Sequence, residues 1–223
     1  NSRSLQDFSL QYGEPLGDAH LRRLLAKKLS TLNVHTVPEH IITTVGATHA
    51  LDIVSRTLLR PGDPVMVEEP GWAVEFARLA ALGMRILPVP RRADGPDLEV
   101  MARYCEVHQP KLYVSVSVFH NPTGYCLSPG SAHRVLQLAN QHNFHVVDDD
   151  TYSHIAPEHA TRLTALDGLQ RTIYGSGFED SCAQRAHWFP GGPAESGGAP
   201  ARHQAAGHPH HPCLAGKSPG PVH

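Results

Sequence analysis

Three stretches of the chain carry apolar side chains every three or four positions, the spacing that places them on one face of an α-helix. The first follows Asp18, a residue type that caps helix starts, and carries four leucines, the last of them Leu29. The second begins around Thr48 and ends before Pro61-Gly62, and the third begins at Ser128-Pro129. The sequence therefore predicts three amphipathic helices.

Between these helices lie short apolar runs that are rich in β-branched residues, as buried parallel strands are. They cover residues 65–67, 86–89, 112–118, 144–147 and 172–174. Strands that alternate with helices predict a mainly parallel sheet with helices on both faces, which is a three-layer α/β/α fold.

The pattern stops after Phe178. Residues 179–223 contain seven Gly and seven Pro but few large apolar side chains, so they bury too little surface to offset the entropy of ordering them. We expect one α/β domain over residues 1–178 and a disordered tail over 179–223. Because the chain opens at Asn1 without a methionine, we also expect it to be a fragment of a longer product.

Charge and composition narrow the function classes. The chain has 19 Lys and Arg against 21 Asp and Glu, a formal net charge of −2, which argues against a nucleic-acid-binding module. No apolar run is long enough to span a membrane. The four cysteines are irregularly spaced, which is not the pattern of a disulfide framework. We expect a cytoplasmic protein with no nucleic acid and no membrane among its partners.

Four polar clusters follow predicted strands or open predicted helices, where ligands bind in open α/β sheets. They are residues 46–49, 121–124, 148–152 and 176–178. Each has an ordinary explanation. The first could be a phosphate-binding helix start or simply a capped helix, and the second is typical of a turn. The three aspartates at 148–150 repel one another, so a solvated loop or a Mg²⁺ ion are competing explanations.

Together, the order and spacing of the four clusters resemble the fold-type I aminotransferases, which use pyridoxal 5′-phosphate. The resemblance is closest to the aminotransferase-like domain of the MocR subfamily of GntR-type regulators. Residues 12–17, 61–63 and 67–72 also match, and the resemblance covers about residues 4–178. It implies the large domain of a pyridoxal-phosphate-dependent transferase, incomplete in this chain.

The resemblance assigns the phosphate and the stacking partner. It implies that backbone groups at Ala47 and Thr48, together with the Ser176 hydroxyl, hold the cofactor phosphate. Trp72 takes the position at which the family places an aromatic ring stacked on the pyridine, and it follows a Pro-Gly turn.

The remaining site residues would contact the pyridine ring itself. The resemblance implies that Asn121 and Tyr152 hydrogen-bond the phenolic oxygen and that Asp149 pairs with the ring nitrogen. A carboxylate at that place keeps the nitrogen protonated, since an opposite charge favours the cationic form. The protonated ring is the electron sink of carbanion chemistry.

The family pattern breaks after the last predicted strand, where the family continues as Ser-x-Ser-Lys. That lysine forms the Schiff base with the cofactor, but here Phe178 is followed by Glu179, and the next lysine is Lys217. We therefore expect no catalytic residue in this chain. The loss of two nucleotides after the Phe178 codon would explain the break, because the restored codons TCG and AAG encode serine and lysine. The tail is then an out-of-frame product.

Three functions remain open at this stage. The resemblance implies transfer of an amino group between an amino acid and a 2-oxo acid, by a homodimer if the protein is intact. Alternatively, the same fold senses the cofactor and switches an attached DNA-binding domain, or the chain is a decayed gene product without activity. The tail also holds four potential zinc or nickel ligands, which are His208, His210, His211 and Cys213. Their spacing matches no closed site, so we expect no metal function.

Overall fold

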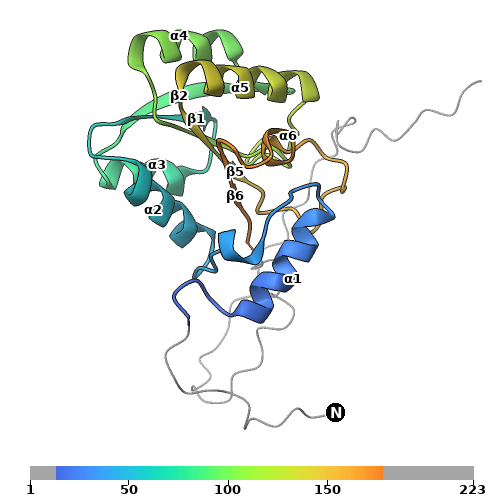
Figure 1. Cartoon of the computed structure of the whole chain (residues 1–223). Coiled ribbons are helices and arrows are strands. Elements are labelled where there is room, and N and C mark those ends of the chain that lie inside the picture. Colours follow the sequence, from blue (N-terminus) through green and yellow to red (C-terminus); the bar gives the residue numbers. More distant parts are fainter. Residues whose placement is uncertain (1–13, 178–223) are drawn as a thin grey trace, which may run out of the picture.

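The computed structural model describes residues 14–177, and helices and strands alternate along them (Figure 1). The helices are α1 (Ala19–Ser30), α2 (Ala47–Leu58), α3 (Ala73–Ala81), α4 (Leu98–His108), α5 (Pro129–His142) and α6 (Leu163–Asp167), with a 3-10 turn η2 (Pro38–His40). The strands are β1 (Pro64–Glu69), β2 (Arg85–Arg92), β3 (Gly95–Pro96), β4 (Leu112–Ser115), β5 (His145–Asp149) and β6 (Thr172–Gly175).

The six strands form one sheet in the order β3-β2-β1-β4-β5-β6. All neighbours pair in parallel except β2 and β3, which pair antiparallel at one edge. From β1 the chain first builds outward to β2 and then returns to place β4 on the other side of β1. The strand order therefore reverses between β1 and β4, which is where doubly wound sheets form their ligand crevice.

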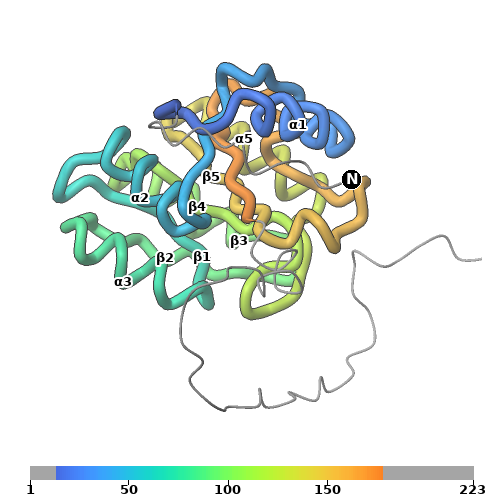
Figure 2. Tube along the Cα trace, turned by 90° about the horizontal axis from the view of Figure 1, so that it is seen from below, coloured from blue at the N-terminus to red at the C-terminus, as the bar shows by residue number. Residues whose placement is uncertain are grey.

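Alternation along β1 divides the apolar side chains between two cores. Val65 and Val67 pack with residues of α2 and α3 on one face, whereas Met66 packs with α4 and α5 on the other. Figure 1 shows these two helix pairs on opposite sides of the sheet, and Figure 2 shows from below that α2 and α3 lie side by side. The prediction of a three-layer α/β/α fold with a mainly parallel sheet is confirmed.

The three predicted helices are present. Ser128 caps α5 by accepting a hydrogen bond from the Ser131 amide at 3.1 Å, and Pro129 occupies the first helical position, as the sequence predicts. α2 begins at Ala47 and ends at Leu58, before Pro61.

α1 departs from the expected amphipathic packing. Its buried residue is Arg22, whose guanidinium donates to the Pro38 carbonyl at 2.9 Å and to the Glu14 carboxylate at 2.8 Å. Leu21 and Leu24 remain 44% and 52% exposed. Within residues 14–177, the side of α1 that carries Arg22 is therefore buried, and Leu21 and Leu24 are not.

Strand β4 ends at Ser115, earlier than the predicted run over 112–118. The reason is a side chain, since the Val116 amide donates to the Glu68 carboxylate at 3.1 Å instead of continuing the ladder. α3 and α4 were not predicted, although Asp97 caps α4 by accepting from the amides of Glu99 and Val100.

The expected boundary at residue 178 and the expected disorder of residues 179–223 lie outside the described residues. Within residues 14–177, none of the helices has the length and the apolar character needed to cross a bilayer.

Candidate functional site

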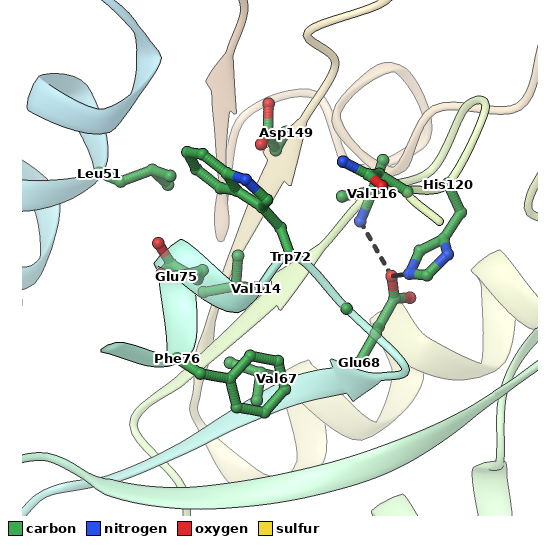
Figure 3. Close-up of a pocket in the computed structure, with 12 residues that line it drawn as sticks. Leu51, Val67, Glu68, Trp72, Glu75, Phe76, Val114, Val116, His120 and Asp149 are labelled. Atoms are coloured by element: carbon green, nitrogen blue, oxygen red, sulfur yellow. Dashed lines mark hydrogen bonds and ion pairs between the residues drawn. The ribbon is translucent and has the colours of Figure 1, made fainter. Parts of the chain in front are cut away.

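A hollow opens at the reversal point of the sheet, between the ends of β1 and β4 and beside the end of β5. The residues that line it include three of the predicted cofactor ligands, Trp72, Asn121 and Asp149. The remaining lining residues are Leu51, Val67, Glu68, Gly71, Glu75, Phe76, Val114, Val116 and His120. Figure 3 shows how these side chains lie around what we call the first hollow.

Trp72 reaches the first hollow because the chain turns sharply after β1. It is the N-cap residue of α3 and is 37% exposed. Gly71 makes the turn possible, because a Cβ atom there would lie 2.3 Å from the Glu68 carbonyl oxygen. Only glycine allows this close approach of backbone to backbone.

Asn121 lies in the loop that follows β4. His120 starts the turn, since the Gly124 amide donates to its carbonyl at 2.6 Å, and its own amide donates to the Tyr125 carbonyl at 2.8 Å. Asn121 itself is exposed at the mouth of the hollow, which leaves its amide group accessible to a ligand.

Asp149 is the last residue of β5. One of its carboxylate oxygens accepts from the Thr151 hydroxyl at 2.7 Å. Burial raises the pKa of the Asp149 carboxyl, and Glu75 on the neighbouring α3 adds to that rise, while the hydrogen bond from Thr151 opposes it. Within residues 14–177 no Lys or Arg pairs with Asp149, so a cation placed beside it would find an unpaired carboxylate.

The other two aspartates of the cluster serve the fold. Fully buried Asp148 accepts from the Ser117 hydroxyl at 2.5 Å and from the amide and hydroxyl of Thr164, both at 3.0 Å. Asp150 pairs with the buried guanidinium of Arg162 at 2.5 Å. The two carboxylates are buried, so a solvated loop does not describe them. Within the described residues, no group of three or more His, Cys, Asp or Glu side chains could hold a metal ion.

The predicted phosphate turn lies next to a second hollow, which shares Leu51 and Asp149 with the first. Ala47 lines the second hollow together with Gly175 of β6. Gly46, the N-cap residue of α2, has φ 80° and has no side chain with which to cap the helix. Thr48 is exposed and does not line either hollow.

Ser176 and Tyr152 are held by other contacts. The Ser176 hydroxyl donates to the Asp150 carbonyl at 3.1 Å and lies 2.9 Å from the Ser153 hydroxyl. Tyr152 lies in the loop after β5, where its carbonyl accepts from the amides of Ile155 and Ala156. Neither residue lines the two hollows.

Two buried polar residues of the first hollow, Glu68 and His120, were not predicted as site residues from the sequence. Glu68 is 4% exposed and His120 is 1% exposed, and they lie 3.1 Å apart. Signals for both are present in the sequence: a carboxylate at the end of an apolar run and a histidine directly before the Asn-Pro-Thr-Gly turn.

The family profile described as aminotransferase class I and II matches residues 4–177, well over half of the chain. The chain belongs to this family. A 2-aminoadipate transaminase of Thermus thermophilus is 31% identical over 169 residues, 76% of this chain and 41% of that protein. An uncharacterised HTH-type transcriptional regulator of Bacillus subtilis is 25% identical over 188 residues, 82% of this chain and 39% of the regulator. The resemblance to both groups is confirmed.

Solved structures agree with this membership. The crystal structure of α-aminoadipate aminotransferase from T. thermophilus, complexed with N-(5′-phosphopyridoxyl)-L-leucine, matches with a TM-score of 0.69 and 30% identity over 76% of this chain and 43% of that one. An archaeal alanine:glyoxylate aminotransferase matches with a TM-score of 0.72 and 27% identity, over 76% of this chain and 44% of that one. The fold is that of the large domain of these transferases. The chain spans about two fifths of the length of the curated relatives named above.

Proposed function

We propose that this chain is the cofactor-binding part of an aminotransferase-like domain and binds pyridoxal 5′-phosphate without a covalent link. The observation that carries the proposal is that Trp72, Asn121 and Asp149 line one hollow at the reversal point of the sheet. These residue types suit a flat, cationic heteroaromatic ring, because they offer an aromatic face, an amide and a carboxylate.

Asp149 would hold a proton on the pyridine nitrogen. Its burial disfavours the charged carboxylate when it is alone, and a pyridinium beside it would restore the charged form. When bound, the cofactor supplies an electron sink for chemistry at the amino acid carbon.

The phosphate would lie at the start of α2, where Ala47 and Thr48 follow Gly46. Ser176 would join them after its hydroxyl turns away from the Asp150 carbonyl. Tyr152 would reach the phenolic oxygen only after a movement of its loop, since it does not line either hollow.

A polypeptide with this sequence would not catalyse amino transfer. The proposed site contains no lysine, and the next one after Lys111 is Lys217 in the tail that we infer to be out of frame. With the frame restored, the substrates would be an amino acid and a 2-oxo acid, and the protein would be a cytoplasmic homodimer. Sequencing the codons around Phe178 tests the frame break directly. If those codons encode serine and lysine without a break, the polypeptide contains the lysine and this part of the proposal is wrong.

Titration of the purified chain with pyridoxal 5′-phosphate, followed by the cofactor's absorbance, tests the binding site. Loss of a charge-assisted hydrogen bond costs about 1.5–3 kcal/mol, so Asp149→Asn should weaken binding by about 10- to 150-fold. Asp97→Asn is the matched control, because asparagine keeps the cap of α4 and Asp97 does not line either hollow. Equal affinity of both variants and the wild type would refute the assignment of Asp149.

The second candidate is a sensor domain that binds the same cofactor and switches an attached DNA-binding domain. The similarity to HTH-type transcriptional regulators of B. subtilis and Escherichia coli favours it. Sequencing the gene upstream of the codon for Asn1 separates the candidates. An in-frame helix-turn-helix segment would favour the sensor, and an in-frame start without one would favour the enzyme.

A further inference from the structure

One buried carboxylate collects polar contacts from two strands and from the loop that follows one of them. Glu68 accepts from the Arg91 guanidinium at 2.7 Å, the Tyr113 hydroxyl at 2.6 Å and the Ser115 hydroxyl at 3.3 Å, all at the same oxygen. Its other oxygen accepts from the Val116 amide at 3.1 Å and lies 3.1 Å from His120 Nε2. Despite the burial, these donors hold the pKa of Glu68 below its usual range. The group is therefore a fixed negative charge.

The two oxygens of Glu68 serve different tasks. Arg91 balances the charge at one oxygen, and its side chain is fully buried in the pair. The other oxygen faces the loop after β4, where it holds Val116 at the start and His120 near the tip (Figure 3). The contacts at this second oxygen tie the loop after β4 to the end of β1.

His120 passes this constraint to the next residue. A carboxylate can only accept, so Nε2 of His120 donates to Glu68. Nδ1 lies 2.9 Å from the Thr123 hydroxyl, within hydrogen-bond distance. The ring is 1% exposed and is contacted at both nitrogens, and Asn121 lies between His120 and Thr123 in the sequence.

Glu68 also begins the turn that carries the stacking residue. The close approach of Gly71 to the Glu68 carbonyl folds the chain back, and Trp72 follows directly. The same residue thus fixes the loop on each side of the first hollow.

We propose that Glu68 and His120 are positioning residues that hold Asn121 against the phenolic oxygen of the cofactor, an inference that rests on the proposed function. Neither residue needs to contact that oxygen. Their effect should appear in how well the site distinguishes a ring that has the hydroxyl from one that lacks it.

The test compares the affinities for pyridoxal 5′-phosphate and for an analogue in which hydrogen replaces the ring hydroxyl. Removing an outer partner of a binding residue typically costs about tenfold or more, so His120→Leu should reduce the preference for the hydroxyl about tenfold. Asn121→Ala should reduce it to a similar extent, and the double variant should lose no more than either single one. In His120→Gln an amide N–H can still donate to Glu68, so the preference should stay within about twofold of the wild type.

The ratio of the two affinities separates positioning from general damage, because partial unfolding lowers both affinities equally. Met101→Ala, in the core on the other face of the sheet, is the control for stability and should leave the ratio unchanged. If His120→Leu does not fold, Thr123→Val removes the hydroxyl bonded to Nδ1 and should shift the ratio in the same direction.

The inference is overturned if Asn121→Ala loses the preference for the hydroxyl while His120→Leu keeps it. If Thr123→Val has to take the place of His120→Leu, the same outcome in that variant overturns it. The proposed function would remain intact in either case. A wild-type chain that does not bind either compound would overturn both.

Discussion

The loop that carries Tyr152 is closed by a buried ion pair, and its removal should destabilise the protein in a way that depends on pH. Arg162 donates to Asp150 at 2.5 Å and also to the carbonyls of Glu158 and Ala160. Both partners of the pair have fully buried side chains. In Arg162→Met the carboxylate loses its counter-charge, and breaking a buried pair in this way costs about 3–5 kcal/mol.

The pH dependence follows from the pKa of Asp150, which burial raises from 3.8 to about 6 although Arg162 opposes the rise. Because the pKa is higher in the folded state, protonation of Asp150 favours folding. This contribution to the free energy of unfolding is fully present below pH 3.8 and is lost as the pH rises through about 6. Without Arg162 the folded pKa rises further, so this loss continues to higher pH. Each further pH unit costs up to about 1.4 kcal/mol, so the penalty should grow by up to about 3 kcal/mol between pH 6 and 8.

Urea unfolding of the wild type and Arg162→Met at pH 6 and 8 measures this difference. Replacing both charges, as in Asp150→Asn with Arg162→Met, should recover most of the loss. Arg92→Met is the control, because the Arg92 side chain is 64% exposed in its pair with Asp97 and such pairs contribute about 1 kcal/mol or less. A penalty below about 1 kcal/mol at pH 8, or an equal penalty at both pH values, would refute the reasoning.

Three further predictions concern the turn, a helix start and the missing chemistry. Gly71→Ala should lower the melting temperature and weaken cofactor binding, since the new Cβ would lie 2.3 Å from the Glu68 carbonyl oxygen; an unchanged melting curve would contradict this. Ser128→Ala should cost about 1 kcal/mol in urea unfolding because it removes the cap of α5, with Ser30→Ala as an exposed control. Incubation with the cofactor, several amino acids and a 2-oxo acid should give no turnover above background, and borohydride should trap no covalent adduct at the site; turnover or a trapped adduct would count against the assignment.

Much of the fold was predictable because burial on both faces leaves a clear pattern. The β-branched runs at 65–67 and 144–147 became central strands for that reason. The packing of α1 was not predictable in the same way. Periodicity shows which side of a helix is apolar, but it does not show whether another element covers that side, and Arg22 is the residue that became buried.

The residues of the candidate site were also predictable only in part. Trp72, Asn121 and Asp149 come together because the carboxyl ends of parallel strands meet at one edge of a sheet. Glu68 and His120 are 52 positions apart, and only the placement of β4 beside β1 makes them neighbours. A carboxylate after a strand looks like a solvated residue until that neighbour is known.

The bond from Val116 to Glu68 spans 48 positions and has a consequence for how the chain folds. The intervening segment forms α3, β2, β3 and α4, so the pairing of β4 with β1 closes a long stretch of chain. Contacts of such long range form late, because the entropy of closing the loop is lost before the contact can repay it. Partly folded chains would therefore lack the first hollow, and the cofactor would recognise only molecules in which β1 and β4 have already met.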